Sequence, residues 1–263
     1  MALKFNWKKN LPKIIWGVIL LILILCLIKI KIWEDHYYAE KEGSARAIAI
    51  TNTTAPDTTE EVNETDVTED DKQSWKVAAN KPRFLTIEKL GIDRARIVEI
   101  GVNNEGRLQA PVSIFDVGWY RTSGKPGQGG VLLLDGHNGG PTKEGVFKHL
   151  PELAVGDIIT IERGDGKFFR YVVAENEEVP LNEADSMMNR MFTPISAGKE
   201  GLSIITCTGE WSQVRRTYLS RQFLRATLVE ESTDYQPVEF KNELKEKREA
   251  DAKKAEEEAS KSE

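Results

Sequence analysis

The sequence predicts an all-β domain, a barrel or a sandwich, between residues 82 and 231. Short runs of β-branched and aromatic residues recur there, each bounded by Gly, Pro, Asn or Asp. Helical patterns are sparse, which favours an antiparallel β architecture. About 150 residues suffice for one hydrophobic core. The predicted strands are Arg83–Ile87, Ile97–Val102, Gly130–Asp135, Ile158–Arg163, Phe168–Ala174, Leu202–Cys207 and Leu219–Val229.

Three further elements follow from local patterns. Gly164-Asp165-Gly166 separates two of the predicted strands and is typical of a hairpin turn. We expect a short helix from Glu183 to Met191 and one helical turn from Gly145 to Leu150.

The N-terminus predicts a membrane anchor. Residues 1–13 carry four lysines and form the predicted cytoplasmic end, and residues 14–33 are almost uninterruptedly apolar. A bilayer core about 30 Å thick needs roughly 20 helical residues, so residues 14–33 predict one transmembrane helix. The leading lysines favour an N-terminus inside the cell. A cleaved secretory signal is the alternative, but no small-x-small cleavage site follows. Either interpretation places the following domain outside the cell.

The segments that flank the predicted domain are polar. Residues 34–81 include a stretch from 57 to 71 whose only charges are acidic, which predicts a disordered, self-repelling stalk. Residues 232–263 are dominated near their end by Lys, Glu, Ala and Arg without an apolar stripe, which predicts a charged tail that is disordered or helical.

Composition excludes several classes of function. The net charge is −6 and the domain has no large basic stretch, so we expect no nucleic-acid partner. The two cysteines, Cys26 and Cys207, do not indicate a disulfide scaffold, because Cys26 belongs to the apolar run. Two scattered histidines and a thiol make no plausible zinc site. Gly136–Gly140 lacks the Lys-Ser/Thr of a phosphate-binding loop, so we expect no metal and no cofactor.

Three side chains suit a cysteine acyl-transferase. Cys207 ends an apolar run, and its thiol, with a free pKa of about 8.5, needs a neighbouring cation to attack a carbonyl as thiolate. His137 follows another apolar run and could be that partner and the acid that protonates a leaving amine. Arg221 keeps its proton and presents a fixed fork of donors, which suits an oxyanion.

Taken singly, these residues have simpler explanations. A lone cysteine after a strand is more often a buried structural residue, and a lone histidine there usually packs or lies in a loop. Arg221 competes with Arg215, Arg216 and Arg225 for the role of oxyanion donor. Residue types alone therefore indicate only an exported β-domain with a free thiol.

The order of motifs adds a family resemblance. The series runs through Phe84–Ile92, Val102–Pro111, Val117–Tyr120, Lys125–Gly130, Asp135–His137, Gly145–Leu150 and Leu153–Asp157, and closes with Thr206-Cys207 and Arg221. In this order it resembles the sortase family of Gram-positive-type bacteria. The family's Thr-Leu-x-Thr-Cys motif appears here as Ser-Ile-Ile-Thr-Cys, ending at Cys207. The resemblance implies a closed sortase-type β-barrel with Cys207 as nucleophile, His137 as the histidine and Arg221 as the arginine.

The same resemblance implies an activity. Sortases cut a C-terminal sorting signal, commonly Leu-Pro-x-Thr-Gly or a relative, and hold the acyl half as a thioester on the cysteine. An amine from a peptidoglycan precursor or a pilin lysine then accepts it. We therefore expect a single-pass enzyme of the cell membrane that acts outside the cell on secreted proteins. The connection Asn176–Lys199 is expected to wall the substrate groove, with Met187 and Met188 as adaptable contacts. Simple core packing is the alternative there.

Two rival functions stay open at this point. An exported cysteine hydrolase or L,D-transpeptidase would carry Ser-x-Gly-Cys, whereas here Gly209 comes after the cysteine. A stalked β-domain that binds wall or partner proteins without catalysis is the other rival. Trp211 borders the groove mouth or merely packs, and His149 and His36 are expected to have no chemical role.

Overall fold

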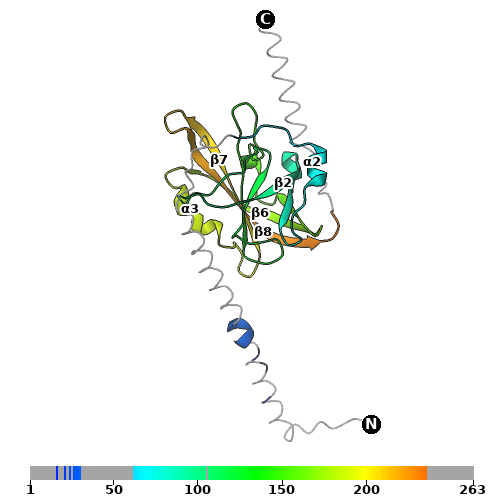
Figure 1. Ribbon diagram of the computed structural model, residues 1–263. Coiled ribbons are helices and arrows are strands. Elements are labelled where there is room, and N and C mark those ends of the chain that lie inside the picture. The colour runs from blue at the N-terminus through cyan, green and yellow to red at the C-terminus, as the bar shows by residue number, and fades with distance from the viewer. Residues whose placement is uncertain are drawn as a thin grey trace, which may run out of the picture.

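A computed structural model describes residues 62–104 and 106–235, together with Trp16, Leu21, Ile24 and residues 26–30. Eight strands close into a barrel in the order β1-β2-β3-β4-β7-β8-β6-β5 (Figure 1). The strands are β1 (Pro82–Ile87), β2 (Ile92–Ile100), β3 (Val117–Tyr120), β4 (Val131–Asp135), β5 (Ile158–Arg163), β6 (Phe168–Pro180), β7 (Gly201–Ser212) and β8 (Thr217–Ser232). The helices are α2 (Glu69–Ser74) and α3 (Ala184–Met191), with 3-10 turns η1 (Glu88–Leu90) and η2 (Leu150–Glu152). The predicted closed barrel with short helices is confirmed for this region.

All seven predicted strands overlap observed ones, and α3 corresponds to the predicted helix. Strand β3 was not predicted, because it has only four residues and all of them are buried. The expected helical turn at Gly145–Leu150 is present as two hydrogen-bonded turns and not as an α-helical turn. Lys148 N donates to Gly145 O and Leu150 N donates to Phe147 O, both at 3.1 Å, and the 3-10 turn η2 follows from Leu150.

The predicted hairpin turn between β5 and β6 is confirmed. Arg163 N donates to Lys167 O at 2.8 Å, and Gly166 has φ +84°, which only glycine adopts without strain. The barrel closes where β5 also pairs antiparallel with β1, with Leu85 opposite Ile161. No sheet edge remains open in the ring of eight strands.

Two hydrophobic clusters lie on opposite faces of the strands that carry the site. The barrel interior includes Leu202 and Ile204 of β7, whereas Ile205 belongs to a second cluster on the outer face. This outer cluster contains Phe223 of β8 and is covered by α3. Burial of both faces explains why β4 begins with the continuous apolar run Val131–Leu134 and why β7 is buried without alternation from Gly201 to Thr206.

The predicted disordered stalk, residues 34–81, is wrong for its last part. Residues 62–81, here called the N-terminal arm, run along the barrel and contain α2, which lies beside β2 (Figure 1). Near its end, Gly164 N donates to Lys81 O at 2.9 Å, and a Cβ on Gly164 would lie 2.3 Å from Ala78 O. The arm is ordered by hydrogen bonds to the barrel, which compensate for its low apolar content.

The remaining predicted segments lie outside the described residues. These are the cytoplasmic end 1–13, most of the anchor 14–33, residues 34–61 of the stalk and the tail from residue 236 onward. Within the part of the chain that the structure describes, no helix has both the length and the apolar character to cross a bilayer.

Candidate active site

Strand pairing brings the three predicted site residues to one end of three neighbouring strands. Strands β7 and β8 run antiparallel, and Cys207 is the direct partner of Arg221. Strands β4 and β7 run parallel, with Asp135 opposite Ile205. His137 follows Asp135 by two positions, as Cys207 follows Ile205, so His137 leaves β4 at the level of Cys207. Directly opposite residues of paired strands share a face, so Cys207 and Arg221 project to the same side.

Two side chains fasten the loop after β4 to strand β7. Thr206 Oγ1 donates to Gly136 O at 2.7 Å, and Asn138 Nδ2 donates to Cys207 O at 2.8 Å. A Cβ on Gly136 would lie 2.6 Å from the ring of Phe147, so only glycine fits the turn that leads to the histidine. The two bonds bracket His137 on both sides and hold its backbone beside Cys207. Sequence reasoning did not identify Asn138, although it directly follows the histidine.

The imidazole of His137 is buried and has a defined partner. Its Nε2 lies 2.7 Å from Pro111 O, and the residue is 7% exposed. A backbone carbonyl only accepts hydrogen bonds, so Nε2 carries a hydrogen. In the neutral ring, Nδ1 is then the nitrogen with a free lone pair. The contact with Pro111 O therefore leaves Nδ1 as the ring nitrogen that could accept a proton.

Cys207 is half-buried and unbridged. It occupies the outer face of the barrel in line with Ile205, at the edge of the cluster under α3. Cys207 is thus not sealed in the barrel core.

Arg221 is 2% exposed and is held by its own strand. The guanidinium donates to Ser220 O at 2.9 Å, to Tyr218 O at 3.1 Å and to Thr217 Oγ1 at 3.1 Å. A guanidinium has five N–H donors, so these three bonds do not use its full donor capacity. The fork is fixed before any substrate arrives, which is what stabilisation of a developing oxyanion requires.

The three other arginines considered for the oxyanion role do not lie opposite Cys207. Arg225 donates to Glu175 Oε2 and to Thr193 O, both at 2.7 Å, and so ties β8 to β6 and to the segment after α3. Arg215 and Arg216 lie exposed at the tip of the β7–β8 hairpin. The three therefore have structural or surface positions, and Arg221 alone of the four is the strand partner of Cys207.

The segment Asn176–Lys199 combines packing with surface contacts. Met188 and Met191 are buried in the cluster that also contains Ile205, whereas Met187 is only partly buried against it. Met188 thus follows the core-packing alternative, and Met187 lies at the cluster's margin. On the projecting part of the β7–β8 hairpin, Trp211 packs edge-on against Tyr218 with ring centroids 5.2 Å apart.

His149 lies on the surface, where Nδ1 is 2.5 Å from Glu152 Oε1 and Nε2 is 3.2 Å from Glu144 Oε2. This agrees with the surface role expected from the sequence. Among the described residues, no three His, Cys, Asp or Glu side chains gather in a way that could hold a metal ion.

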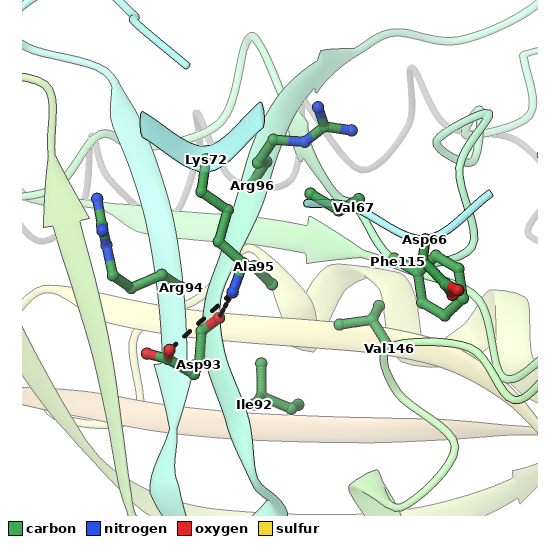
Figure 2. Close-up of a pocket in the computed structure, with 10 residues that line it drawn as sticks. All are labelled: Asp66, Val67, Lys72, Ile92, Asp93, Arg94, Ala95, Arg96, Phe115 and Val146. Atoms are coloured by element: carbon green, nitrogen blue, oxygen red, sulfur yellow. Dashed lines mark hydrogen bonds and ion pairs between the residues drawn. The ribbon is translucent and has the colours of Figure 1, made fainter. Parts of the chain in front are cut away.

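A separate pocket of about 250 Å³ lies between the N-terminal arm and β2. Figure 2 shows Lys72 of α2 reaching across it to Asp93, whose backbone carbonyl accepts a hydrogen bond at 3.0 Å. Its walls include Val67, Phe115 and Val146. None of the three predicted site residues lines this pocket.

Comparisons with known proteins agree with the resemblance. Residues 85–229, more than half of the chain, match the family model described as Sortase domain. A search of the curated proteins gave no match.

Solved structures with similar folds include three sortases. A sortase from Actinomyces oris is 16% identical, with 68% of this chain and 97% of that chain covered and a TM-score of 0.46. A sortase D5 transpeptidase from Clostridium perfringens is 23% identical, with 62% and 89% covered and a TM-score of 0.40. Sortase C from Streptococcus pneumoniae is 17% identical, with 75% and 92% covered and a TM-score of 0.42. Because these identities and scores are low, family membership rests on the family model.

Proposed function

Because the chain belongs to the sortase family of cysteine transpeptidases, we propose that Cys207, His137 and Arg221 are its catalytic residues. The Cys207 thiolate attacks the carbonyl carbon of the scissile peptide bond, and the carbonyl electron pair moves onto oxygen. The free donors of Arg221 stabilise that oxyanion. His137 protonates the departing amine as the C–N bond breaks, which leaves a thioester on Cys207.

The second half of the reaction returns the enzyme to its starting state. An acceptor amine loses a proton to His137 and attacks the thioester carbonyl. The C–S bond breaks, the Cys207 thiolate is released, and a new amide links donor and acceptor. Water can replace the amine, which gives hydrolysis.

The proposed donor is a secreted protein with a C-terminal sorting signal similar to Leu-Pro-x-Thr-Gly. The proposed acceptor is an amine of a peptidoglycan precursor or a pilin lysine. Residues 14–33 are proposed to anchor the enzyme as a single-pass membrane protein with its N-terminus inside. The barrel would then meet secreted substrates at the outer surface of the cell membrane.

One observation carries the assignment of roles: the register of β4, β7 and β8. It aligns Cys207 with Arg221 directly and brings the exit of β4 to the same level. The buried, chain-tethered guanidinium and the carbonyl-bound imidazole support it further.

Mass spectrometry of the full chain mixed with sorting-signal peptides tests the proposal. We expect an acyl adduct on Cys207 in the wild type, hydroxylamine-sensitive as a thioester is, and none in Cys207→Ala. Absence of any adduct across a broad library of sorting-signal peptides, with the barrel folded, would contradict it and favour a barrel that binds without catalysis.

A further inference from the structure

The N-terminal arm is hydrogen-bonded to the loop that follows His137 through the carboxylate of Glu64. Glu64 Oε1 accepts from Thr142 N at 2.9 Å and from Lys143 N at 3.0 Å, and Oε2 accepts from Thr142 Oγ1 at 2.5 Å. The side-chain hydrogen bond from Thr142 lowers the pKa of Glu64, so the carboxylate is charged at neutral pH. A Cβ on Gly140 would lie 2.3 Å from Glu64 Oε1, so this loop leaves room for the carboxylate only because glycine is there.

The preceding residue of the arm, Asn63, is hydrogen-bonded to a second loop, which contacts the imidazole of His137. Asn63 N donates to Val112 O at 2.8 Å, and Ile114 N donates to Asn63 O at 3.1 Å. Val112 directly follows Pro111, whose carbonyl oxygen accepts from His137 Nε2. Two consecutive arm residues, Asn63 and Glu64, thus hold both loops that fix the imidazole.

Hydrogen bonds within the loop after His137 connect the Glu64 contact to the backbone of the histidine. Gly140 N donates to Lys143 O and Gly145 N donates to Asn138 O, so the loop is a closed hairpin. Phe147 N also donates to His137 O at 3.0 Å. A displacement of the hairpin tip at Thr142 is therefore passed to the backbone of His137.

Further along, the arm spans the pocket instead of packing closely on the barrel. The pocket is lined by Asp66 and Val67 of the arm and by Phe115 and Val146, and Figure 2 shows Val67 above Val146. Apolar burial therefore contributes little to the arm's hold on this side. The hydrogen bonds of Asn63 and Glu64 provide it, together with the exposed ion pair of Asp66 with Lys143 at 2.8 Å and the bond from Lys72 to Asp93 O.

We infer that Glu64 is a positioning residue for catalysis: through the 138–145 hairpin it holds the His137 imidazole in register with Cys207. The inference rests on the proposed function, because it assumes that His137 transfers protons during turnover. It also means that the segment between the predicted anchor and the barrel takes part in assembling the site.

A glutamine can copy the geometry of Glu64. Its Oε1 accepts from the same two backbone N–H groups, and its Nε2 donates to the Thr142 hydroxyl, which accepts as well as donates. Glu64→Gln therefore keeps all three contacts without the charge, whereas Glu64→Ala removes them. Glu69→Ala is the matched control, because among the described residues this arm carboxylate pairs with Lys72 of its own helix α2 and with neither of the two loops.

The test measures kcat and KM of the full chain with a sorting-signal peptide and an amine acceptor. We expect kcat to fall about tenfold in Glu64→Ala while KM changes less than about twofold, since a misplaced imidazole slows proton transfer but leaves peptide binding intact. Glu64→Gln should restore kcat to within about twofold of wild type, and Glu69→Ala should match wild type. In the background of His137→Ala, adding Glu64→Ala should change the residual acylation rate less than about twofold.

Several outcomes would overturn the inference. An active wild type whose kcat is unaffected by Glu64→Ala refutes the positioning role. Equal losses in the wild-type and His137→Ala backgrounds assign the effect to general folding. If Glu64→Ala fails to fold, Thr142→Ala replaces it, since that variant loses only the hydroxyl contact and should lower kcat severalfold; an unchanged kcat there also refutes the role. A wild type without turnover contradicts the proposed function itself, not the arm's role alone.

Discussion

Replacing Arg221 with lysine separates the shape of the guanidinium from its charge. Both side chains are cationic at neutral pH, but the arginine spreads its donors over three fixed partners, Thr217 Oγ1, Tyr218 O and Ser220 O. A lysine ammonium has its donors at one point and cannot satisfy these partners and a substrate oxyanion together.

The expected loss follows from the donors that remain for the substrate. Removal of one oxyanion donor typically costs about 2.7–4 kcal/mol, or about 10²–10³-fold in rate. We therefore expect the acylation rate of Arg221→Lys to fall about 100-fold or more. The lost bonds to the chain should also lower the free energy of unfolding, by about 2 kcal/mol.

The assay is single-turnover acylation of the full chain by a sorting-signal peptide, followed by mass spectrometry, with thermal unfolding in parallel. Arg225→Lys is the matched control, because Arg225 is also buried in β8 but bonds to Glu175 and Thr193. It should lose stability and keep its acylation rate within about threefold. An acylation rate of Arg221→Lys within about threefold of wild type would refute the reasoning, and Arg216→Lys would be the next variant to measure.

Three further outcomes are expected. Cys207→Ala should abolish acylation and leave the melting temperature within a few degrees of wild type, because the side chain is half-buried at a strand end; a large drop would instead mark Cys207 as structural. Glu200→Ala should lower the free energy of unfolding by about 3 kcal/mol in denaturant titrations, because Tyr171 and two loop N–H groups lose their acceptor; a loss below about 1 kcal/mol would mean that water replaces the carboxylate. Hydrogen bonds from Arg163 lower the pKa of Asp165 to about 2, so its stabilisation is present above about pH 4 and is lost as the pH falls through about 2. Asp165→Asn should therefore cost about 1 kcal/mol at pH 7, after allowance for solvent screening, and almost nothing at about pH 1; a cost independent of pH would rule out this linkage.

The strands with strong local patterns were predictable, and those that depend on distant partners were not. β5 was predicted with its observed bounds, because turn residues flank an isolated β-branched run. β3 was missed because Val117–Tyr120 is short and pairs in parallel with β2, a contact that no local pattern reveals.

The N-terminal arm shows the limit of composition as a guide. Residues 62–81 are polar and acidic, which predicts disorder when they are considered alone. Their order comes from hydrogen bonds to the barrel, among them those of Asn63 and Glu64, whose partners lie in loops about 50 and 80 residues further along the chain. The amino-acid composition of a segment does not show whether its carboxylates find hydrogen-bond partners elsewhere in the fold.

The sequence by itself determined the chemical groups of the site, which are a thiol at Cys207, an imidazole at His137 and a guanidinium at Arg221. It also determined the apolar runs at whose ends or within which these residues lie. Only the tertiary structure decided that these groups share a level and that Arg221, not Arg225, is opposite the cysteine. The physical reason is barrel closure, which makes β4 and β7 parallel neighbours across more than 60 residues of chain. Periodicity reports which face of a strand is buried, whereas the identity of the neighbouring strand is set by the packing of the whole barrel.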